Sequence, residues 1–233
     1  MPTSPLDHLA LLIDAQDEFL ATINEVDPAT PVPWCGTWQV DDLVVHLAKI
    51  HHWAAAQARS TDATRLGRGP FVQTDLYREC ARELRDTLTE LGPDTVGSTL
   101  VGQGPASFWR RRQLHETLVH LWDLRTAGGR GLEVPAAVWA DVVDEVVTVM
   151  QPRQVRLGRM LPLPSTIELT ASDVGRTWLL DAAVAGPAVA QLRAPAEVLA
   201  LILWGRASLD RSDVEVSGDV DLLRTALSEP LTP

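Results

Sequence analysis

Apolar residues recur at helical spacing through the first 150 residues of the chain. Leu9, Leu12 and Phe19 begin the first such stripe, and further stripes follow between segments rich in proline or glycine. Polar capping residues mark where three of the helices begin, and the expected caps are Ser4, Thr37 and Thr74. The pattern predicts five helices, at residues 5–23, 38–59, 75–91, 107–127 and 136–150. Helices of this length joined by mostly short loops are typical of a bundle.

The periodicity changes in the last third of the chain. Ile167 and Leu169 alternate with Glu168 and Thr170, which is the pattern of a strand with one buried face. The same reasoning predicts strands at 165–170, 178–182, 189–192 and 214–216, with helices at 195–209 and 220–227. We therefore expect a mainly α protein, with a four- or five-helix bundle at residues 1–155 and a small α+β domain at 156–233.

Charge and composition narrow the function classes. The chain has 20 Lys and Arg against 31 Asp and Glu residues, a net charge of −11 that disfavours nucleic acid as a partner. The longest apolar run, residues 198–204, is much shorter than the roughly 20 residues of a membrane-spanning helix. Two cysteines without paired spacing, and an N-terminus without a secretory pattern, predict a reducing, cytoplasmic location.

Candidate metal ligands lie on two of the predicted helices. His115 and Glu116 are followed by His120, but two histidines five residues apart do not share a helix face, so this is no zinc-protease motif. Glu116 and His120, four residues apart, do share a face. His46, on the inward stripe of the helix at 38–59, is the third candidate. Two histidines and one carboxylate leave part of a metal shell open, and they favour zinc while also suiting nickel, iron or manganese.

Each of these residues also has a plainer interpretation. A single inward histidine is more often a hydrogen-bonded core residue, and a Glu–His pair is more often a surface pair. Asp123, one turn after His120, is either a carboxylate that orients His120 or a surface charge. Arg112 either reaches an anionic ligand or belongs to a solvated face. Trp34 and Trp38 are expected either to line a pocket or to belong to the core. His51, His52 and His115 lie off the faces of the candidate ligands and are expected at the surface.

Two motifs together resemble a known family. They are WCGTWQVDDLVVHL, at residues 34–47, and RQLHETLVHLWD, at residues 112–123. Both resemble segments of the mycothiol-dependent maleylpyruvate isomerases of actinobacteria. That family has a DinB-like metal-binding bundle and a C-terminal domain similar to sterol carrier proteins. Segments 169–173, 203–206 and 216–219, together with Trp178, look like that second domain.

The resemblance implies a function and a set of residues. The three zinc ligands of the family fall on His46, Glu116 and His120, and mycothiol, a sugar thiol, is its cosubstrate. A thiol bound to a metal loses its proton and becomes nucleophilic at neutral pH. Arg206 is the match for a catalytic arginine of the C-terminal domain, while Trp34, Trp38 and Arg112 are expected to contact the cosubstrate. The reaction is isomerisation of a maleylpyruvate-like acid or transfer of the thiol to another electrophile.

Two other functions remain open from the sequence. A metal-bound hydroxide that hydrolyses a small amide or ester would use the same ligands without a thiol. A non-catalytic binder would hold an apolar ligand in the C-terminal domain, its metal being absent or closed by a fourth ligand such as Asp42 or Asp123. The partners expected are small molecules only, and the chain is expected to be a monomer or a homodimer.

Overall fold

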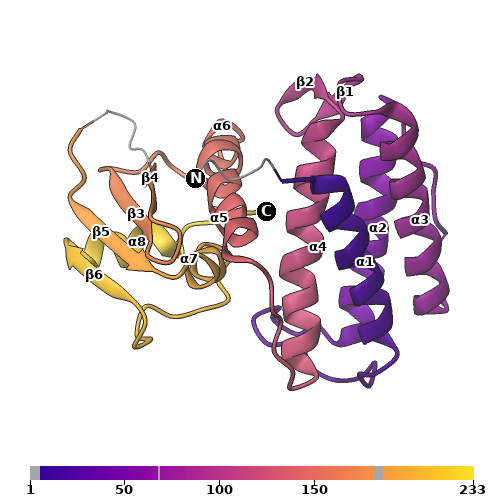
Figure 1. Cartoon of the computed structure of the whole chain (residues 1–233), viewed down its shortest axis with the longest axis horizontal. Coiled ribbons are helices and arrows are strands. Elements are labelled where there is room, and N and C mark those ends of the chain that lie inside the picture. Colours follow the sequence, from indigo (N-terminus) through magenta and orange to yellow (C-terminus); the bar gives the residue numbers. More distant parts are fainter. Residues whose placement is uncertain (1–5, 68, 181–185) are drawn as a thin grey trace. The chain divides into compact units, whose positions relative to one another are not determined.

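The chain divides into two compact units, which meet in sequence at Leu132 and Glu133 (Figure 1). The computed structural model describes residues 6–67, 69–180 and 186–233. The elements of the first unit are α1 His8–Ile23, α2 Val40–Ala58, α3 Gln73–Leu91, β1 Val96–Thr99, β2 Gly102–Pro105 and α4 Ser107–Ala127. Those of the second unit are α5 Ala136–Glu145, η1 Val146–Met150, α6 Gln151–Arg156, β3 Ile167–Ala171, β4 Arg176–Leu180, β5 Ala190–Ala194, α7 Ala196–Leu203, β6 Glu215–Gly218 and α8 Val220–Ser228.

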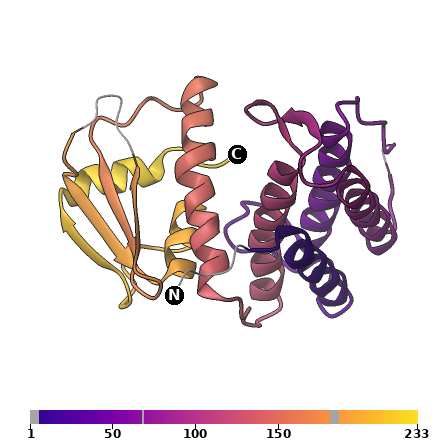
Figure 2. The ribbon, with the colours of Figure 1, turned by 45° about the horizontal axis from the view of Figure 1, so that its top comes forward.

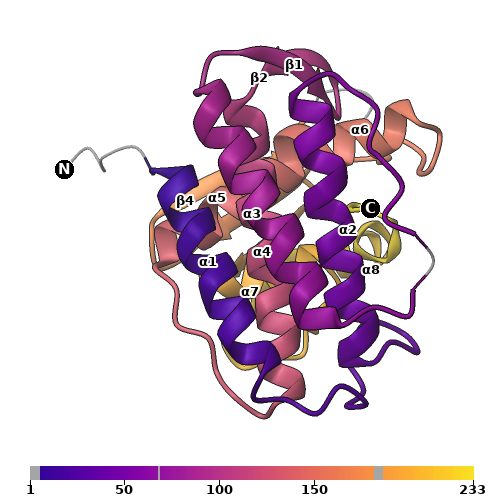
Figure 3. The same ribbon diagram turned by 90° about the vertical axis from the view of Figure 1, so that its right-hand side faces the viewer.

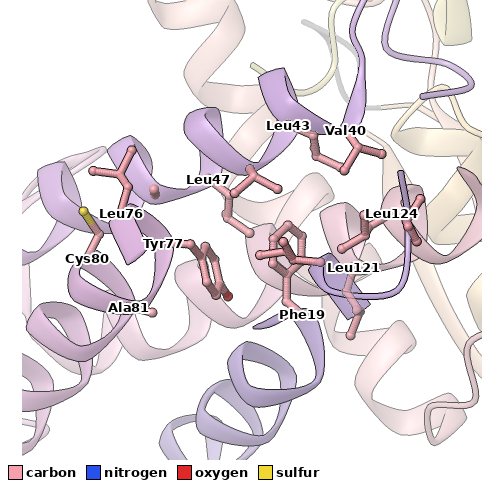
Figure 4. Close-up of a cluster of buried hydrophobic side chains, with 14 of the residues drawn as sticks. Phe19, Val40, Leu43, Leu47, Leu76, Tyr77, Cys80, Ala81, Leu121 and Leu124 are labelled. Carbon is pink, nitrogen blue, oxygen red and sulfur yellow. The ribbon is translucent and has the colours of Figure 1, made fainter. Parts of the chain in front are cut away.

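The first unit is a four-helix bundle (Figure 3). Helix α1 packs against α3 and α4, and α2 packs against the same two helices. Phe19 of α1, Leu47 of α2, Tyr77 of α3 and Leu121 of α4 are all buried and point into one cluster (Figure 4). Every helix thus contributes apolar side chains to a common core, as the sequence predicted. Among the described residues, no helix is both long enough and apolar enough to cross a membrane.

Helix ends follow local capping chemistry, with some differences from the expected caps. Asp7 caps α1 by accepting a hydrogen bond from the Ala10 amide, while Ser4 lies outside the described residues. Helix α2 begins at Val40 rather than after Thr37, because Asp42 turns back to accept a hydrogen bond from the Gln39 amide. Thr74, the expected cap of α3, lies inside that helix, which begins at Gln73 with Val72 as its N-cap.

A two-stranded hairpin, β1–β2, lies between α3 and α4, where no strand was predicted. Its strands are four residues each and rich in glycine, so their sequence carries little strand signal. Strand β1 packs against α2, where Gly97 lies against the Ala58 carbonyl at the C-terminal end of that helix. A side chain at position 97 would overlap the Ala58 carbonyl oxygen, so the hairpin can approach α2 only because this residue is glycine.

The second unit is an α+β domain with one mixed sheet (Figure 2). The strand order is β4-β3-β5-β6, with β3 and β5 parallel and the other neighbours antiparallel. Ile167, Leu169 and Ala171 are buried and alternate with partly exposed residues, which confirms the strand period. Helix α7 packs on β3 and β5, and α8 packs on β5. The expected strand at 178–182 is found at 176–180, and residues 181 and 182 lie outside the described part.

The division between the units differs from the boundary expected at residues 155 and 156. Helix α5, expected in the bundle, packs against α7 and continues through the π-helical turn η1 into α6. Asp144 of α5 accepts a hydrogen bond from the Trp178 indole at 3.0 Å and pairs with Arg176, both of β4. The apolar stripe of α5 therefore packs within the second unit. The sequence pattern shows that this helix has an apolar face, but not which unit that face packs against.

Gly97→Ala is expected to lower the free energy of unfolding by about 1–3 kcal/mol, the usual cost of overpacking against atoms that cannot move aside. Chemical denaturation followed by tryptophan fluorescence measures it. Gly131→Ala is the matched control, because a side chain there meets nothing within 4 Å. Equal stability of the two variants would contradict the close packing of β1 on α2.

A polar pair also joins α2 to α3. His52 Nδ1 lies 2.6 Å from Glu83 Oε2, and its Nε2 lies 2.9 Å from the Thr64 carbonyl oxygen. Burial opposes protonation of His52, but the hydrogen bonds and the Glu83 charge prevail, so the pKa of His52 is raised. A raised pKa in the folded state gives stability that is complete below the unfolded value of about 6.5 and is lost as pH rises through the folded value.

Glu83→Gln is therefore expected to cost about 1 kcal/mol of unfolding free energy at pH 6 and less at pH 9, because a rising pH favours the neutral form of His52. Urea unfolding at the two pH values measures the difference. Glu90→Gln is the control, since Glu90 pairs with Arg59, which stays charged throughout this range. A cost of Glu83→Gln that does not fall between pH 6 and pH 9 would refute the ion pair.

Candidate metal centre

Three potential metal ligands converge in the bundle. His46 lies on α2, and Glu116 and His120 lie one turn apart on α4. His46 Nε2 is 3.5 Å and His120 Nε2 is 3.3 Å from the same carboxylate oxygen, Glu116 Oε1. One ligand atom from each of the three residues lies within 4.8 Å of the others. Within the described part of the chain, no other group of three such residues converges in this way.

The three ligands differ in exposure. The side chain of His46 is 31% exposed, whereas those of Glu116 and His120 are 11% and 6% exposed. The imidazole rings of His46 and His120 meet edge to face, with centroids 5.1 Å apart. The cluster is thus closed on the α4 side and open at His46, so a ligand would reach it from that side.

Outer partners hold two of the three ligands in place. Arg112, one turn before Glu116, is 3% exposed and donates a hydrogen bond from Nη2 to Glu116 Oε2. His120 Nδ1 lies 2.9 Å from Asp123 Oδ2, so this contact keeps a proton on Nδ1 and makes Nε2 the ring nitrogen that faces the cluster. Arg112 thus occupies Glu116 Oε2 and Asp123 occupies His120 Nδ1. Glu116 Oε1 and His120 Nε2 remain directed at the centre of the cluster.

The electrostatics keep Glu116 ionised. Burial alone would raise its pKa, but the Arg112 guanidinium and the hydrogen bonds from His120 and His46 hold the pKa of Glu116 well below its usual range. Burial likewise opposes protonation of His120, but Asp123 and Glu116 raise its pKa to about 9. A cation is therefore favoured at this position, and a divalent metal would supply that charge in place of the proton.

The donor set fits zinc. Two imidazole nitrogens and one carboxylate oxygen are ligands that Zn²⁺ accepts, and three protein ligands leave a position for a further group. The two expected candidates for a fourth ligand are engaged elsewhere. Asp42 caps α2 through the Gln39 amide, and Asp123 holds His120 from behind.

A loop at residues 31–39 borders the open side of the cluster. The Trp38 ring lies beside the His46 imidazole, with centroids 4.9 Å apart. Cys35 Sγ lies 3.6 Å from Asp123 Oδ2. Trp34 is 55% exposed and has a positive φ of 71°, which is unusual for a residue other than glycine. Of the two expected pocket walls, Trp38 contacts a candidate ligand and Trp34 projects toward solvent.

Three histidines expected at the surface are buried instead. His51 and His115 are fully buried and His52 nearly so. His51 Nδ1 makes a 2.8 Å hydrogen bond with Gln113 Oε1, and burial lowers the pKa of His51 to about 4, so it is a neutral core residue. The sequence did contain a signal for the burial of His51, because His51 follows Leu47 by one turn on the apolar side of α2.

A cavity that the sequence pattern did not indicate lies beside α2. It has a volume of about 480 Å³, and Lys49, Trp53 and Arg65 are among the residues that line it. Lys49 and Trp53 follow His46 by three and seven residues, so they lie on the same side of the helix, about one and two turns from His46. Helical spacing from a candidate ligand was the signal that could have identified them.

Arg206, the expected catalytic arginine, lies just after α7 in the second unit. Its Nη1 donates a 2.6 Å hydrogen bond to the Trp204 carbonyl oxygen, and its guanidinium lies over the Trp204 ring. The predicted helix at 195–209 ends earlier, at Leu203, with Gly205 at φ 71°. A catalytic role for Arg206 stays a prediction.

Comparison with known proteins decides the family. Residues 9–125 match the model of the mycothiol maleylpyruvate isomerase N-terminal domain, and residues 133–225 match that of the family's C-terminal domain. The chain belongs to the mycothiol maleylpyruvate isomerase family. The two matches meet near the division between the units described above.

Solved structures of the isomerase share this fold. Crystal structures of the mycothiol-dependent maleylpyruvate isomerase and of a histidine-to-alanine mutant superpose on 92% of this chain and 93% of theirs. The TM-score is 0.66 in both cases, at 16% and 15% sequence identity respectively. A search of curated proteins gives no match. The fold of the mycothiol maleylpyruvate isomerase family is thus retained at a low level of identity.

Asp123→Asn is expected to weaken zinc binding about 10- to 100-fold, because an amide can donate to His120 Nδ1 and so favour the wrong tautomer. Competition against a chromophoric chelator measures the affinity. Asp17→Asn is the matched control, since Asp17 pairs with Arg85 at the bundle surface. Wild-type affinity in Asp123→Asn would show that Asp123 does not orient a metal ligand.

Proposed function

We propose that this protein is a metal-dependent enzyme that uses mycothiol to attack an electrophilic small molecule. The observation that carries the proposal is the convergence of His46, Glu116 and His120 on one point with an open side. Membership of the mycothiol maleylpyruvate isomerase family supports the choice of thiol. Isomerisation of a maleylpyruvate-like acid is the expected reaction, and transfer of the thiol to a retained thioether is the variant outcome.

The residues of the cluster would prepare the site for a divalent metal, with zinc favoured. When bound, such a metal supplies a positive charge that lowers the pKa of a thiol beside it. Arg112 keeps Glu116 ionised and fixes its orientation, and Asp123 sets the tautomer of His120. Trp38 packs on the His46 ring and restricts its rotation.

Isomerisation needs only the substrate and the thiol, and consumes no further reactant. The thiol sulfur adds to one carbon of a conjugated double bond, whose electron pair moves toward the neighbouring carbonyl group. The resulting single bond rotates, and elimination of the same sulfur restores the double bond in the other geometry. The thiol is recovered unchanged, so mycothiol acts catalytically in isomerisation and is consumed in transfer.

Binding of the two small molecules is assigned to residues near the open side. Trp34 and Trp38 would form apolar walls for the cosubstrate. Arg112 is largely enclosed by its contact with Glu116, so its expected effect on a ligand acts through that carboxylate. Arg206 is proposed to bind an anionic group of the substrate, as the family resemblance implies.

The test combines metal content with thiol dependence. Protein purified without added metal is expected to hold about one equivalent of a divalent ion, measured by elemental mass spectrometry. His46→Ala and His120→Ala should lose this metal ion. Their turnover of maleylpyruvate with mycothiol should fall by more than roughly 100-fold, which is the upper range for losing a residue that only orients a ligand. Turnover should require added mycothiol.

His8→Ala is the matched control, because His8 lies on α1 outside the cluster. Absence of metal from the wild-type protein, even after reconstitution with zinc, would refute the proposal. Metal-dependent turnover of small esters or amides that ignores mycothiol would replace it with hydrolysis.

A further inference from the structure

A thiol lies behind the metal centre and contacts the carboxylate that orients His120. Cys35 Sγ is 3.6 Å from Asp123 Oδ2, and the same oxygen accepts the hydrogen bond from His120 Nδ1 at 2.9 Å. Asp123 is completely buried, so its carboxylate depends on protein donors rather than bulk water. Cys35, Asp123 and His120 thus form a chain of contacts that ends at a candidate ligand.

The backbone of the 31–39 loop brings this thiol into position. The Val32 amide donates to the Trp38 carbonyl at 2.9 Å, and the Cys35 amide donates to the Val32 carbonyl at 3.3 Å. Trp34 and Gly36, on either side of Cys35, have positive φ values of 71° and 65°. A non-glycine residue in that region is strained and persists only when surrounding contacts hold it.

The loop is fastened to the cluster at two points. Trp38 packs against His46 on α2, and Cys35 reaches Asp123 on α4. One contact is to His46, a candidate ligand on α2, and the other is to Asp123, the partner of the candidate ligand His120 on α4. The contact to Asp123 comes from a neutral donor, which satisfies a carboxylate lone pair without the positive charge that an arginine would add.

We propose that Cys35 is a positioning residue, whose thiol donates a hydrogen bond to Asp123 and so fixes the carboxylate that orients His120 toward the metal. The inference rests on the metal centre of the proposed function and extends its support to the loop. It assigns no covalent chemistry to Cys35. The alternative role for this side chain is packing alone, which would affect the stability of the loop but leave the His120 imidazole unchanged.

The first test is zinc affinity. Cys35→Ala should bind zinc about 3- to 10-fold more weakly than wild type, a smaller loss than that for a direct partner of the ligand. Cys35→Ser should recover part of the affinity, because a hydroxyl can donate to the same oxygen over a shorter reach. Cys80→Ala is the matched control, since Cys80 is a buried cysteine of α3 outside the cluster.

The second test reads the hydrogen bond itself. In metal-free protein, the Nδ1 proton of His120 should give a downfield NMR resonance that exchanges slowly with water. Cys35→Ala should move this resonance and speed its exchange, while Cys80→Ala should not. Because no metal is needed, this result does not depend on the proposed function.

The outcomes separate the two proposals. Weaker zinc binding together with a moved resonance in Cys35→Ala supports the positioning role. Wild-type affinity, or reduced affinity with an unmoved resonance, overturns it. If wild-type protein binds no zinc, the metal proposal fails, and the resonance alone then decides whether Cys35 orients Asp123.

Discussion

The ionised carboxylate of Glu116 is the constraint around which the first unit is organised. A carboxylate that is only 11% exposed must be compensated by charge and hydrogen bonds, and three side chains supply them. Arg112 occupies one oxygen, and the two histidines face the other. Because His46 comes from a different helix, the compensation requires α2 and α4 to pack closely at this level, and the apolar core beneath them provides that packing.

The polar face of α4 carries the candidate metal ligands, and it also supplies the partners that stabilise these buried groups. Residues 112, 116, 120 and 123 recur at three- and four-residue spacing along one face, and all four are buried. A face with so many ionisable groups contributes little apolar area, so it is stable only because each group has a partner. The charged stripe is evidence for function, since a helix selected for packing alone would place leucine or alanine there.

The sequence predicted the elements better than their assignment to units. Periodicity located all four bundle helices and the candidate ligands on them, because i,i+4 spacing fixes which side chains share a face. It could not place α5, whose apolar stripe fits either unit, and it missed the β1–β2 hairpin, which depends on a glycine lying against a helix end. The contact between Cys35 and Asp123 joins residues 88 positions apart, which no local pattern reveals.

The engagement of nearby carboxylates argues against a purely structural metal. A structural zinc site is normally closed by four protein ligands, and Asp42 and Asp123 are the acidic residues best placed in sequence to complete the set. Asp42 is turned away to cap α2, and Asp123 is bound behind His120. The remaining approach to the cluster passes the exposed edge of His46 and the Trp38 ring. A centre that keeps its open side bordered by an aromatic wall is arranged to admit a ligand, which favours chemistry over scaffolding.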